Sequence, residues 1–431
     1  MDKKKINIVT LGCSKNLVDS ERLYKQLEAN GYSVVHDSND TSAKVVVINT
    51  CGFIGDAKEE SIDTILSFAH AKEKGKIRHL FVMGCLSERY KKDLQLEIPE
   101  VDEFFGVNNL EDIIKAIGGD LKTDLLGERT LTTPTHYAYL KISEGCNWGC
   151  SYCAIPLIRG KHVSVPIESL ITEAKSLAAK GVRELLIIAQ DTTYYGLDIY
   201  GKRMLGELLN KLSEIEGIEW IRLHYAYPTF FPSDVIDVIR DNPKVCKYLD
   251  IPFQHISDKV LKKMRRGINK EETYALINKL KTEIPDIALR TTLLVGHPGE
   301  TEAEFLQLVE FVKDVKFDRL GVFPYSEEEN TYAAINFDDA VSEETKQERV
   351  EAIMQLQSEI ALTKNKDRVG KKMRVLIDRF EGDFYIARSQ YDSPEVDQEV
   401  LIDADRDAII GKFYDVKITD AEEFDLFAKF I

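Results

Sequence analysis

The chain has 431 residues, 57 of them lysine or arginine and 73 aspartate or glutamate, which gives a formal net charge of −16 at pH 7. This length predicts about three domains, each long enough to bury its own core. The acidic balance argues against a general nucleic-acid binder. No signal peptide or long apolar span is visible and the 7 cysteines are sparse, so we expect a cytoplasmic protein with reduced thiols and no membrane partner.

Three apolar runs in the N-terminal part of the chain each end at a cysteine. Continuous runs rich in β-branched residues predict strands buried on both faces of a parallel sheet. The runs, with what we call the strand-end cysteines, are 6–12 before Cys13, 45–50 before Cys51 and 80–84 before Cys85. Because neighbouring parallel strands end at one edge of a sheet, we expect these thiols to converge. The alternative is three independently buried thiols.

Residues 1–120 are predicted to form a Rossmann-like domain. Amphipathic helices alternate with its strands, as in 17–30, where Leu23 and Leu27 share one face. The polar segment 119–135 is predicted to be a linker to the next domain.

A second domain is predicted over 132–365, where strands alternate with helices. The strand candidates are 137–143, 184–190, 220–225, 248–253, 287–295 and 318–323. Such alternation predicts a parallel sheet with right-handed crossovers. Six units in place of the eight of a closed barrel predict an open (β/α)6 partial barrel, with room for a macromolecular substrate.

Cys146, Cys150 and Cys153, here called the motif cysteines, follow the first of these strands with the spacing C-x3-C-x2-C. An iron-sulfur cluster that only transfers electrons takes four thiolates. Three thiolates leave one iron open to a substrate or cofactor. The alternative is a structural zinc site with His162 as the fourth ligand, since Cys3His sites exist.

A long helix is predicted over 342–367, with Ser342 as its N-cap. Short strands without helices then predict a small antiparallel β-barrel at 368–431. These strands are 372–378, 384–388, 399–402, 412–418 and 424–430.

The predicted tail barrel holds ten basic and fifteen acidic residues. We expect it to repel RNA and to attract a basic protein. The acidic side chains proposed for this docking are Asp392, Glu395, Asp397, Glu399, Asp403, Asp405 and Asp407.

Along the chain, the strand-end cysteines are followed by the motif cysteines on a six-stranded barrel and then by a small β-barrel. In this order the chain resembles, over nearly its whole length, the methylthiotransferases of the radical S-adenosylmethionine (radical SAM) superfamily. In that family the tail barrel is a TRAM domain. Local runs are similar to the RimO type, which modifies an aspartate of a ribosomal protein. These runs are 142–146, 189–192, 222–225, 248–252 and 295–301. The tRNA-modifying branch typically has Gly-Gln-Asn where this chain has Ala189-Gln190-Asp191, and the arginine that usually follows the family's serine is here Val165.

This resemblance implies two 4Fe-4S clusters and S-adenosyl-L-methionine (SAM) as cofactors. The cluster on the motif cysteines would cleave SAM to methionine and a 5′-deoxyadenosyl radical, which removes hydrogen from an unactivated carbon. The auxiliary cluster on the strand-end cysteines would carry the sulfur that a second SAM methylates. The implied target is the β-carbon of an aspartate in uS12, the small-subunit ribosomal protein at the decoding centre. A flavodoxin or ferredoxin type of protein is the implied electron donor.

Four other residues could contact SAM, because each lies at the carboxyl end of a predicted strand or just after it. They are Gln190, Asp191, Gln254 and Gly296. A polar loop start, or a tight turn at the glycine, explains them about as well. The basic run 262–266 could meet an acidic partner, although such a run is more often a solvated helix face.

Two other functions are compatible with the residues. One is methylthiolation of an adenosine in tRNA, for which a basic tail is expected. The other is an iron-sulfur carrier or electron-transfer protein, which would bind no SAM and release no 5′-deoxyadenosine.

Overall fold

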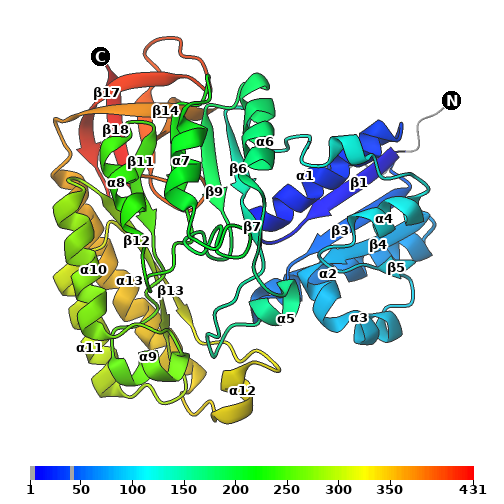
Figure 1. The fold of residues 1–431 in the computed structure, drawn as a ribbon, viewed down its shortest axis with the longest axis horizontal. Coiled ribbons are helices and arrows are strands. Elements are labelled where there is room, and N and C mark those ends of the chain that lie inside the picture. The colour runs from blue at the N-terminus through cyan, green and yellow to red at the C-terminus, as the bar shows by residue number, and fades with distance from the viewer. Residues whose placement is uncertain (1–4, 39–42) are drawn as a thin grey trace. The chain divides into compact units, whose positions relative to one another are not determined.

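The computed structural model describes residues 5–38 and 43–431 (Figure 1). The chain forms two compact units. The first holds the N-terminal part up to Thr133 together with Ser143–Trp148 and Cys153–Val165. The second holds Pro134–Ile142, Gly149–Tyr152 and Pro166–Ile431. The loop with the motif cysteines therefore belongs partly to each unit.

The first unit is built on a five-stranded sheet in the order β2-β1-β3-β4-β5, and all its pairs are parallel. Its main elements are β1 (Lys5–Thr10), α1 (Ser14–Ala29), β2 (Ser33–His36), β3 (Val45–Thr50), α2 (Gly55–Glu73), β4 (His79–Gly84), α3 (Cys85–Glu97), β5 (Glu103–Phe104) and α4 (Leu110–Ile117). The three predicted strands are confirmed as β1, β3 and β4. Every residue of β3 is buried because the sheet has a core on both faces: Val47 packs in one cluster and Ile48 in the other.

The remaining elements of the first unit are η1 (Thr123–Leu125), α5 (Ile155–Arg159) and a two-stranded ribbon of β7 (Ser143–Glu144) and β8 (Val163–Ser164). The predicted linker is anchored within this unit. Arg129 and Glu21 form an ion pair of 2.8 Å, and both side chains are only 1% exposed. Thr132 also donates its backbone N–H to Glu21. The segment is polar because it carries partners for α1.

The second unit contains a six-stranded sheet in the order β13-β12-β11-β10-β9-β6. Its elements up to the tail are β6 (Tyr137–Lys141), α6 (Ile167–Ala179), β9 (Glu184–Ile188), α7 (Leu205–Ser213), β10 (Trp220–Leu223), α8 (Ser233–Asp241), β11 (Val245–Asp250), α9 (Asp258–Met264), α10 (Lys270–Glu283), β12 (Ala288–Val295), α11 (Glu302–Val315), β13 (Arg319–Pro324), α12 (Tyr332–Asn336) and α13 (Glu343–Lys366). All pairs are parallel and follow chain order, which confirms the predicted open partial barrel.

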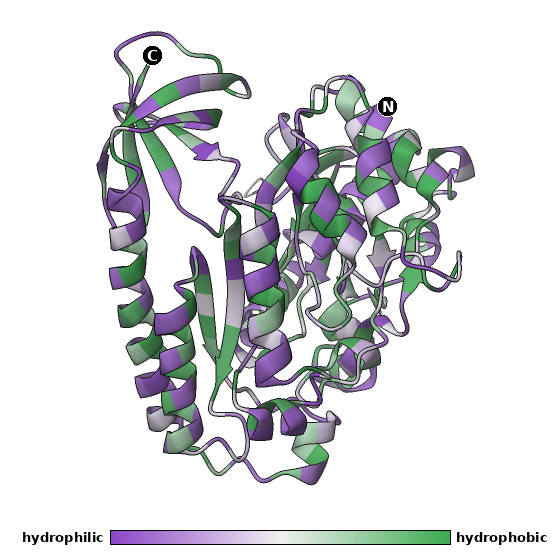
Figure 2. Cartoon of the chain, turned by 60° about the vertical axis from the view of Figure 1, so that its left-hand side comes forward, coloured by the Kyte–Doolittle hydropathy of each residue, from purple (hydrophilic) through white to green (hydrophobic). Residues whose placement is uncertain are grey.

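The flanking helices carry both hydrophobic and hydrophilic residues, as expected of helices with one face on a sheet (Figure 2). Their ends follow the sequence. The Ser342 side chain accepts a hydrogen bond from the backbone of Thr345, which confirms the predicted N-cap of α13. Asn269 and Glu272 form a reciprocal capping box at α10. Among the helices in the described ranges, none is long and apolar enough to cross a membrane.

The tail forms a closed barrel in the order β14-β15-β16-β18-β17. Its strands are β14 (Lys372–Glu381), β15 (Phe384–Ser389), β16 (Glu399–Asp403), β17 (Phe413–Ala421) and β18 (Asp425–Phe430). The predicted barrel is confirmed, with one difference in pairing. β16 and β18 run parallel, and the other four pairs are antiparallel. Val375, Val400 and Val416 belong to the apolar core that fills it.

Candidate functional site

The strand-end cysteines follow three neighbouring parallel strands of the first unit. Cys13 is the N-cap residue of α1 beyond β1, Cys51 comes directly after β3, and Cys85 is the first residue of α3 after β4. The order β1-β3-β4 within the sheet brings these strand ends to one edge. The structure thus gives the strand-end cysteines the placement that the sequence predicts.

Burial and the nearby thiols raise the pKa of Cys51 and Cys85 and favour their protonated forms. Burial raises the pKa of Cys85 to about 12, and the nearby Cys13 and Cys51 raise it further, while Arg159 opposes them. Burial also raises the pKa of Cys51. Thiolates are the metal-binding form, so metal binding here must release protons. Among the described residues, no three histidine, cysteine, aspartate or glutamate side chains are already grouped so that they could hold a metal ion.

Asn16 organises this edge of the sheet. Its amide donates to the carbonyl of Leu11 at 2.9 Å and to that of Thr50 at 3.0 Å, next to the first two cysteines. Its Oδ1 lies 3.8 Å from the Cys85 sulfur and accepts a hydrogen bond of 2.6 Å from Arg159. Asn16 therefore connects all three strand ends.

Arg159, at the end of α5, is a functional candidate that the sequence analysis missed. It is 4% exposed and donates to Glu144 at 2.9 Å as well as to Asn16. Asp19 lies 3.4 Å away, so two carboxylates compensate the buried charge. The sequence signal was weak, because a single arginine before a glycine has many uses.

Gly12 leaves space beside these thiols. Its φ is +87°, and a Cβ there would lie 3.0 Å from the Cys51 sulfur and 2.6 Å from the Cys51 Cβ. A side chain at this position would be strained and would press on the thiol. Three soft sulfur donors at one strand edge, with a glycine backbone against one of them, fit an iron-sulfur cluster.

The motif cysteines lie on the loop between β7 and α5. In the first unit, Cys146 donates its backbone N–H to the carbonyl of Gly160 at 3.1 Å. His162, the alternative zinc ligand, is 4% exposed, and its Nε2 lies 3.0 Å from the hydroxyl of Ser164. This contact gives the ring nitrogen a hydroxyl partner. The position before Cys150 is Gly149, where an added Cβ would meet open space.

Cys150, in the second unit, is surrounded by Tyr227 and Arg266. The Tyr227 hydroxyl lies 3.5 Å from the Cys150 sulfur, and Arg266 Nη1 also lies 3.5 Å from it. The next residue, Ser151, is fixed by a backbone N–H to the carbonyl of Met264 and by its own carbonyl, which accepts from Ala333. The loop is therefore held by α9 and α12.

The four predicted SAM contacts all lie beyond the carboxyl ends of sheet strands. Asp191 is 1% exposed and accepts hydrogen bonds from the backbone and hydroxyl of Thr193 at 2.8 and 2.7 Å. Gln190 precedes it and is partly exposed. A backbone bond of 2.9 Å to Thr292 holds Gln254 in a left-handed conformation, with a φ of 71°. Such strain often accompanies a binding site.

Gly296 has a φ of +74°, and an added Cβ would lie 2.4 Å from Cγ of Lys346. Its N–H donates to Glu300 at 2.9 Å. Close packing under α13 and a tight turn therefore account for the glycine.

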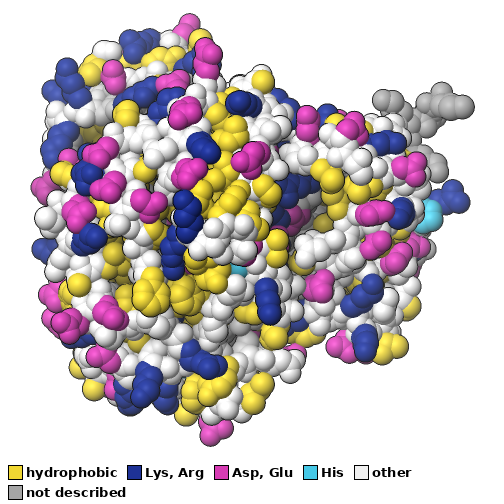
Figure 3. All heavy atoms as spheres, viewed as in Figure 1, with side chains coloured by type: hydrophobic (Ala, Val, Ile, Leu, Met, Phe, Trp, Pro, Cys, Tyr) yellow, Lys and Arg dark blue, Asp and Glu magenta, His cyan; other side chains and the backbone are white. Residues whose placement is uncertain are grey.

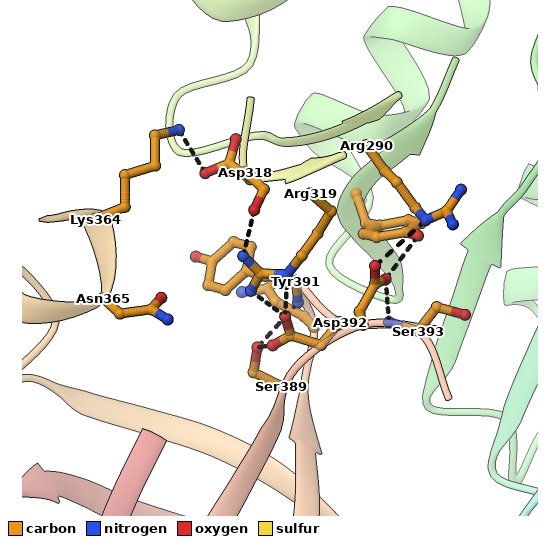
Figure 4. A network of polar contacts seen from close by, with 12 residues as sticks. Arg290, Asp318, Arg319, Lys364, Asn365, Ser389, Tyr391, Asp392 and Ser393 are labelled. Carbon is orange, nitrogen blue, oxygen red and sulfur yellow. Dashed lines mark hydrogen bonds and ion pairs between the residues drawn. The ribbon is translucent and has the colours of Figure 1, made fainter. Parts of the chain in front are cut away.

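The acidic residues proposed for docking a basic partner are partly used inside the second unit (Figure 4). Asp392 is fully buried and accepts from Nε of Arg319 at 3.0 Å. The Tyr248 hydroxyl donates to Asp397 at 2.8 Å, and those of Tyr137 and Tyr139 donate to Glu395. The prediction is wrong for Asp392 and Asp397, because the segment between β15 and β16 buries their side chains against the strands of the parallel sheet. Glu395 remains exposed.

Glu399 and Asp403 face cations of the barrel itself, Arg379 and Lys429. Asp405 and Asp407 remain exposed. On the face shown in Figure 3, lysine and arginine are interspersed with aspartate and glutamate, with no continuous patch of one sign.

Three family models match the chain. They are described as the radical SAM superfamily over residues 140–312, uncharacterized protein family UPF0004 over 5–106 and the TRAM domain over 369–431. Full-length relatives include the ribosomal protein uS12 methylthiotransferase RimO of Phocaeicola vulgatus, 58% identical over 100% of both chains. The protein of the same name from Bacteroides thetaiotaomicron is 55% identical over 100% of this chain and 99% of its own.

Solved structures similar to this chain include the radical SAM methyltransferase TsrM of Kitasatospora setae, with a TM-score of 0.56 and 15% identity over 77% of this chain and 74% of that one. The cobalamin-dependent radical enzyme OxsB has a TM-score of 0.52 and 13% identity, over 82% and 56% of the two chains. At these identities the similarity concerns the fold alone.

Proposed function

The chain belongs to the RimO family of ribosomal protein uS12 methylthiotransferases, and we propose on this basis that it transfers a methylthio group to the β-carbon of an aspartate in uS12. The observation that carries the proposal is the presence of two cysteine triplets, one beyond the carboxyl ends of β1, β3 and β4 and the other on the loop between β7 and α5. The names of the full-length relatives favour this branch over the tRNA-modifying one and over an electron carrier.

In this proposal the strand-end cysteines hold an auxiliary 4Fe-4S cluster and the motif cysteines hold the radical SAM 4Fe-4S cluster. When bound, the clusters and SAM supply the reductive cleavage, the carbon radical and the sulfur. The protein orients them. Asn16 and Arg159 fix the edge that carries the first triplet, and α9 and α12 fix the loop that carries Cys150.

We assign three domains: 1–120 with the auxiliary cluster, 132–365 as the radical SAM domain, and 368–431 as the TRAM barrel. The ranges of the three family models support this division. Gln190, Asp191, Gln254 and Gly296 are proposed to face SAM, through their backbone as much as their side chains. A cytoplasmic location and a flavodoxin or ferredoxin type of electron donor complete the proposal.

Replacement of each cysteine triplet tests the two-cluster assignment. Anaerobically reconstituted protein should hold about eight irons. Alanine at all three motif cysteines should halve the iron and abolish 5′-deoxyadenosine. Alanine at all three strand-end cysteines should also halve the iron but leave SAM cleavage measurable. If the strand-end variant keeps all its iron, the auxiliary site is wrong.

A further inference from the structure

Arg266 lies in a basic run that resembles a solvated helix face, yet its side chain is buried. It is 3% exposed, whereas its neighbour Arg265 is exposed. Its Nη1 lies 3.5 Å from the Cys150 sulfur and 3.4 Å from the Tyr152 hydroxyl. Its Nη2 donates to the carbonyl of Pro252, and its guanidinium stacks on the Tyr227 ring at 4.2 Å. The group is therefore held in one position beside the thiol.

This buried cation differs from the other large buried arginines in its partners. Arg129, Arg222, Arg319 and Arg388 each form an ion pair with a carboxylate. Within the described ranges, no carboxylate oxygen lies within 4.0 Å of Arg266. A buried charge without a counter-charge is strongly destabilising. The surroundings of Arg266 are therefore suited to an anionic sulfur at Cys150.

The proton on Tyr227 does not compete with Arg266 for that sulfur. The Tyr227 hydroxyl has one proton to donate. The carbonyl of Arg266, at 2.8 Å, is closer to this hydroxyl than the sulfur at 3.5 Å. Tyr227 therefore donates to the backbone of Arg266, and the guanidinium is left as the donor to the Cys150 sulfur.

We propose that Arg266 is a positioning residue that raises the reduction potential of the iron-sulfur cluster on the motif cysteines, by donating a hydrogen bond to the Cys150 sulfur and placing a positive charge beside it. The inference rests on the proposed cluster at these cysteines. Reduction adds one electron from the external donor to an already anionic thiolate-bound cluster, with no proton transferred. A fixed nearby cation stabilises the reduced form more than the oxidised form, and hydrogen bonds to sulfur act in the same direction.

The test is a redox titration of the reconstituted full-length chain, followed by electron paramagnetic resonance. The signal that changes when SAM is added identifies the cluster. Arg266→Gln removes the charge and should lower the midpoint potential. At a fixed potential the ratio of oxidised to reduced cluster should rise at least tenfold, which equals about 59 mV for a one-electron couple.

Two controls separate this effect from a general loss of structure. Arg265→Gln removes a neighbouring exposed charge and should titrate close to the unchanged protein. Arg266→Lys keeps the charge, but its amine cannot reach Cys150, Tyr152 and Pro252 together, so its potential should fall by less. Arg266→Lys is the variant to titrate if Arg266→Gln does not assemble the cluster.

An Arg266 variant that assembles the cluster and titrates at the unchanged potential overturns the inference, as does an equal shift in Arg265→Gln. Failure of the proposed cluster gives a different result, because the unchanged protein would then show no cluster signal that responds to SAM, whereas a wrong substrate assignment would leave that signal and its dependence on Arg266 in place.

Discussion

At the scale of single residues, the buried charges described above, apart from Arg266, have a partner of opposite charge. Asp378 of β14 accepts hydrogen bonds from His136 at 2.7 Å and from Arg388. Burial alone would raise the pKa of Asp378, but the charge of Arg388 and these hydrogen bonds lower it to about 2. The carboxylate therefore links the barrel to the start of the parallel sheet as an anion.

The pKa of Asp378 predicts a pH-dependent contribution to stability. Because the folded pKa lies below the unfolded value, the ionised group stabilises the fold above about pH 4, and this stabilisation is lost as the pH falls toward 2. Asp378→Asn should lose about 2 kcal/mol of unfolding free energy at pH 7 and roughly half of that at pH 3. Urea unfolding of the apoprotein at both values measures it, with exposed Asp405→Asn as the control. An equal loss at both values would contradict the assignment.

At the scale of elements, the 389–398 segment attaches the barrel to the parallel sheet. Arg222 donates to the carbonyl of Gln390 at 2.7 Å, and Ser393 accepts or donates a bond of 3.0 Å with His224. Burial opposes ionisation of Asp392, but Arg319 and Arg368 keep its pKa below the usual value. The segment places acidic side chains beside cations at the starts of sheet strands. One example is Asp392, which lies beside Arg319, the first residue of β13.

Removal of the Asp392 carboxylate should detach this segment. Asp392→Ala leaves Arg319 buried without its partner, which should cost about 3–5 kcal/mol of stability. We expect a lower unfolding temperature, and faster proteolysis near residues 367–371, between α13 and β14. The matched change Asp407→Ala, at an exposed position, should alter stability by less than about 0.5 kcal/mol. Equal effects of the two changes would show that the contact with Arg319 contributes little.

Sequence patterns predicted the strands whose pattern lies within one continuous stretch of residues. Continuous apolar runs predicted β3 and the six strands of the second sheet. They missed β2 and β5, which have four and two residues, too few for a periodic pattern. The parallel pairing of β16 with β18 depends on how the barrel closes, which no local pattern encodes.

The residues of the candidate site also fall into two groups: those that the local sequence predicts and those that only the fold brings together. The cysteines were predicted because their spacing is short or because they end strands. Arg266 and Tyr227 lie 116 and 77 residues from Cys150, so only the fold brings them together. Arg266 also lies in a charge run in which Lys262 and Arg265 are exposed.

At the scale of the whole molecule, net charge is a poor guide to the partner surface. The tail has an acidic excess, but Asp392 and Asp397 are buried in contacts with the parallel sheet. Exposed acids such as Asp405 and Asp407 are what remains for a basic partner.

The most direct measurement is mass spectrometry of purified uS12 after anaerobic incubation with the reconstituted chain, SAM and a reductant, with tRNA in a parallel reaction. We predict that uS12 gains one methylthio group in place of a hydrogen on an aspartate, that the tRNA is unchanged, and that the variant with alanine at all motif cysteines gives no product. Methylthiolated tRNA with unmodified uS12, or SAM cleavage with neither product, would contradict the proposed function.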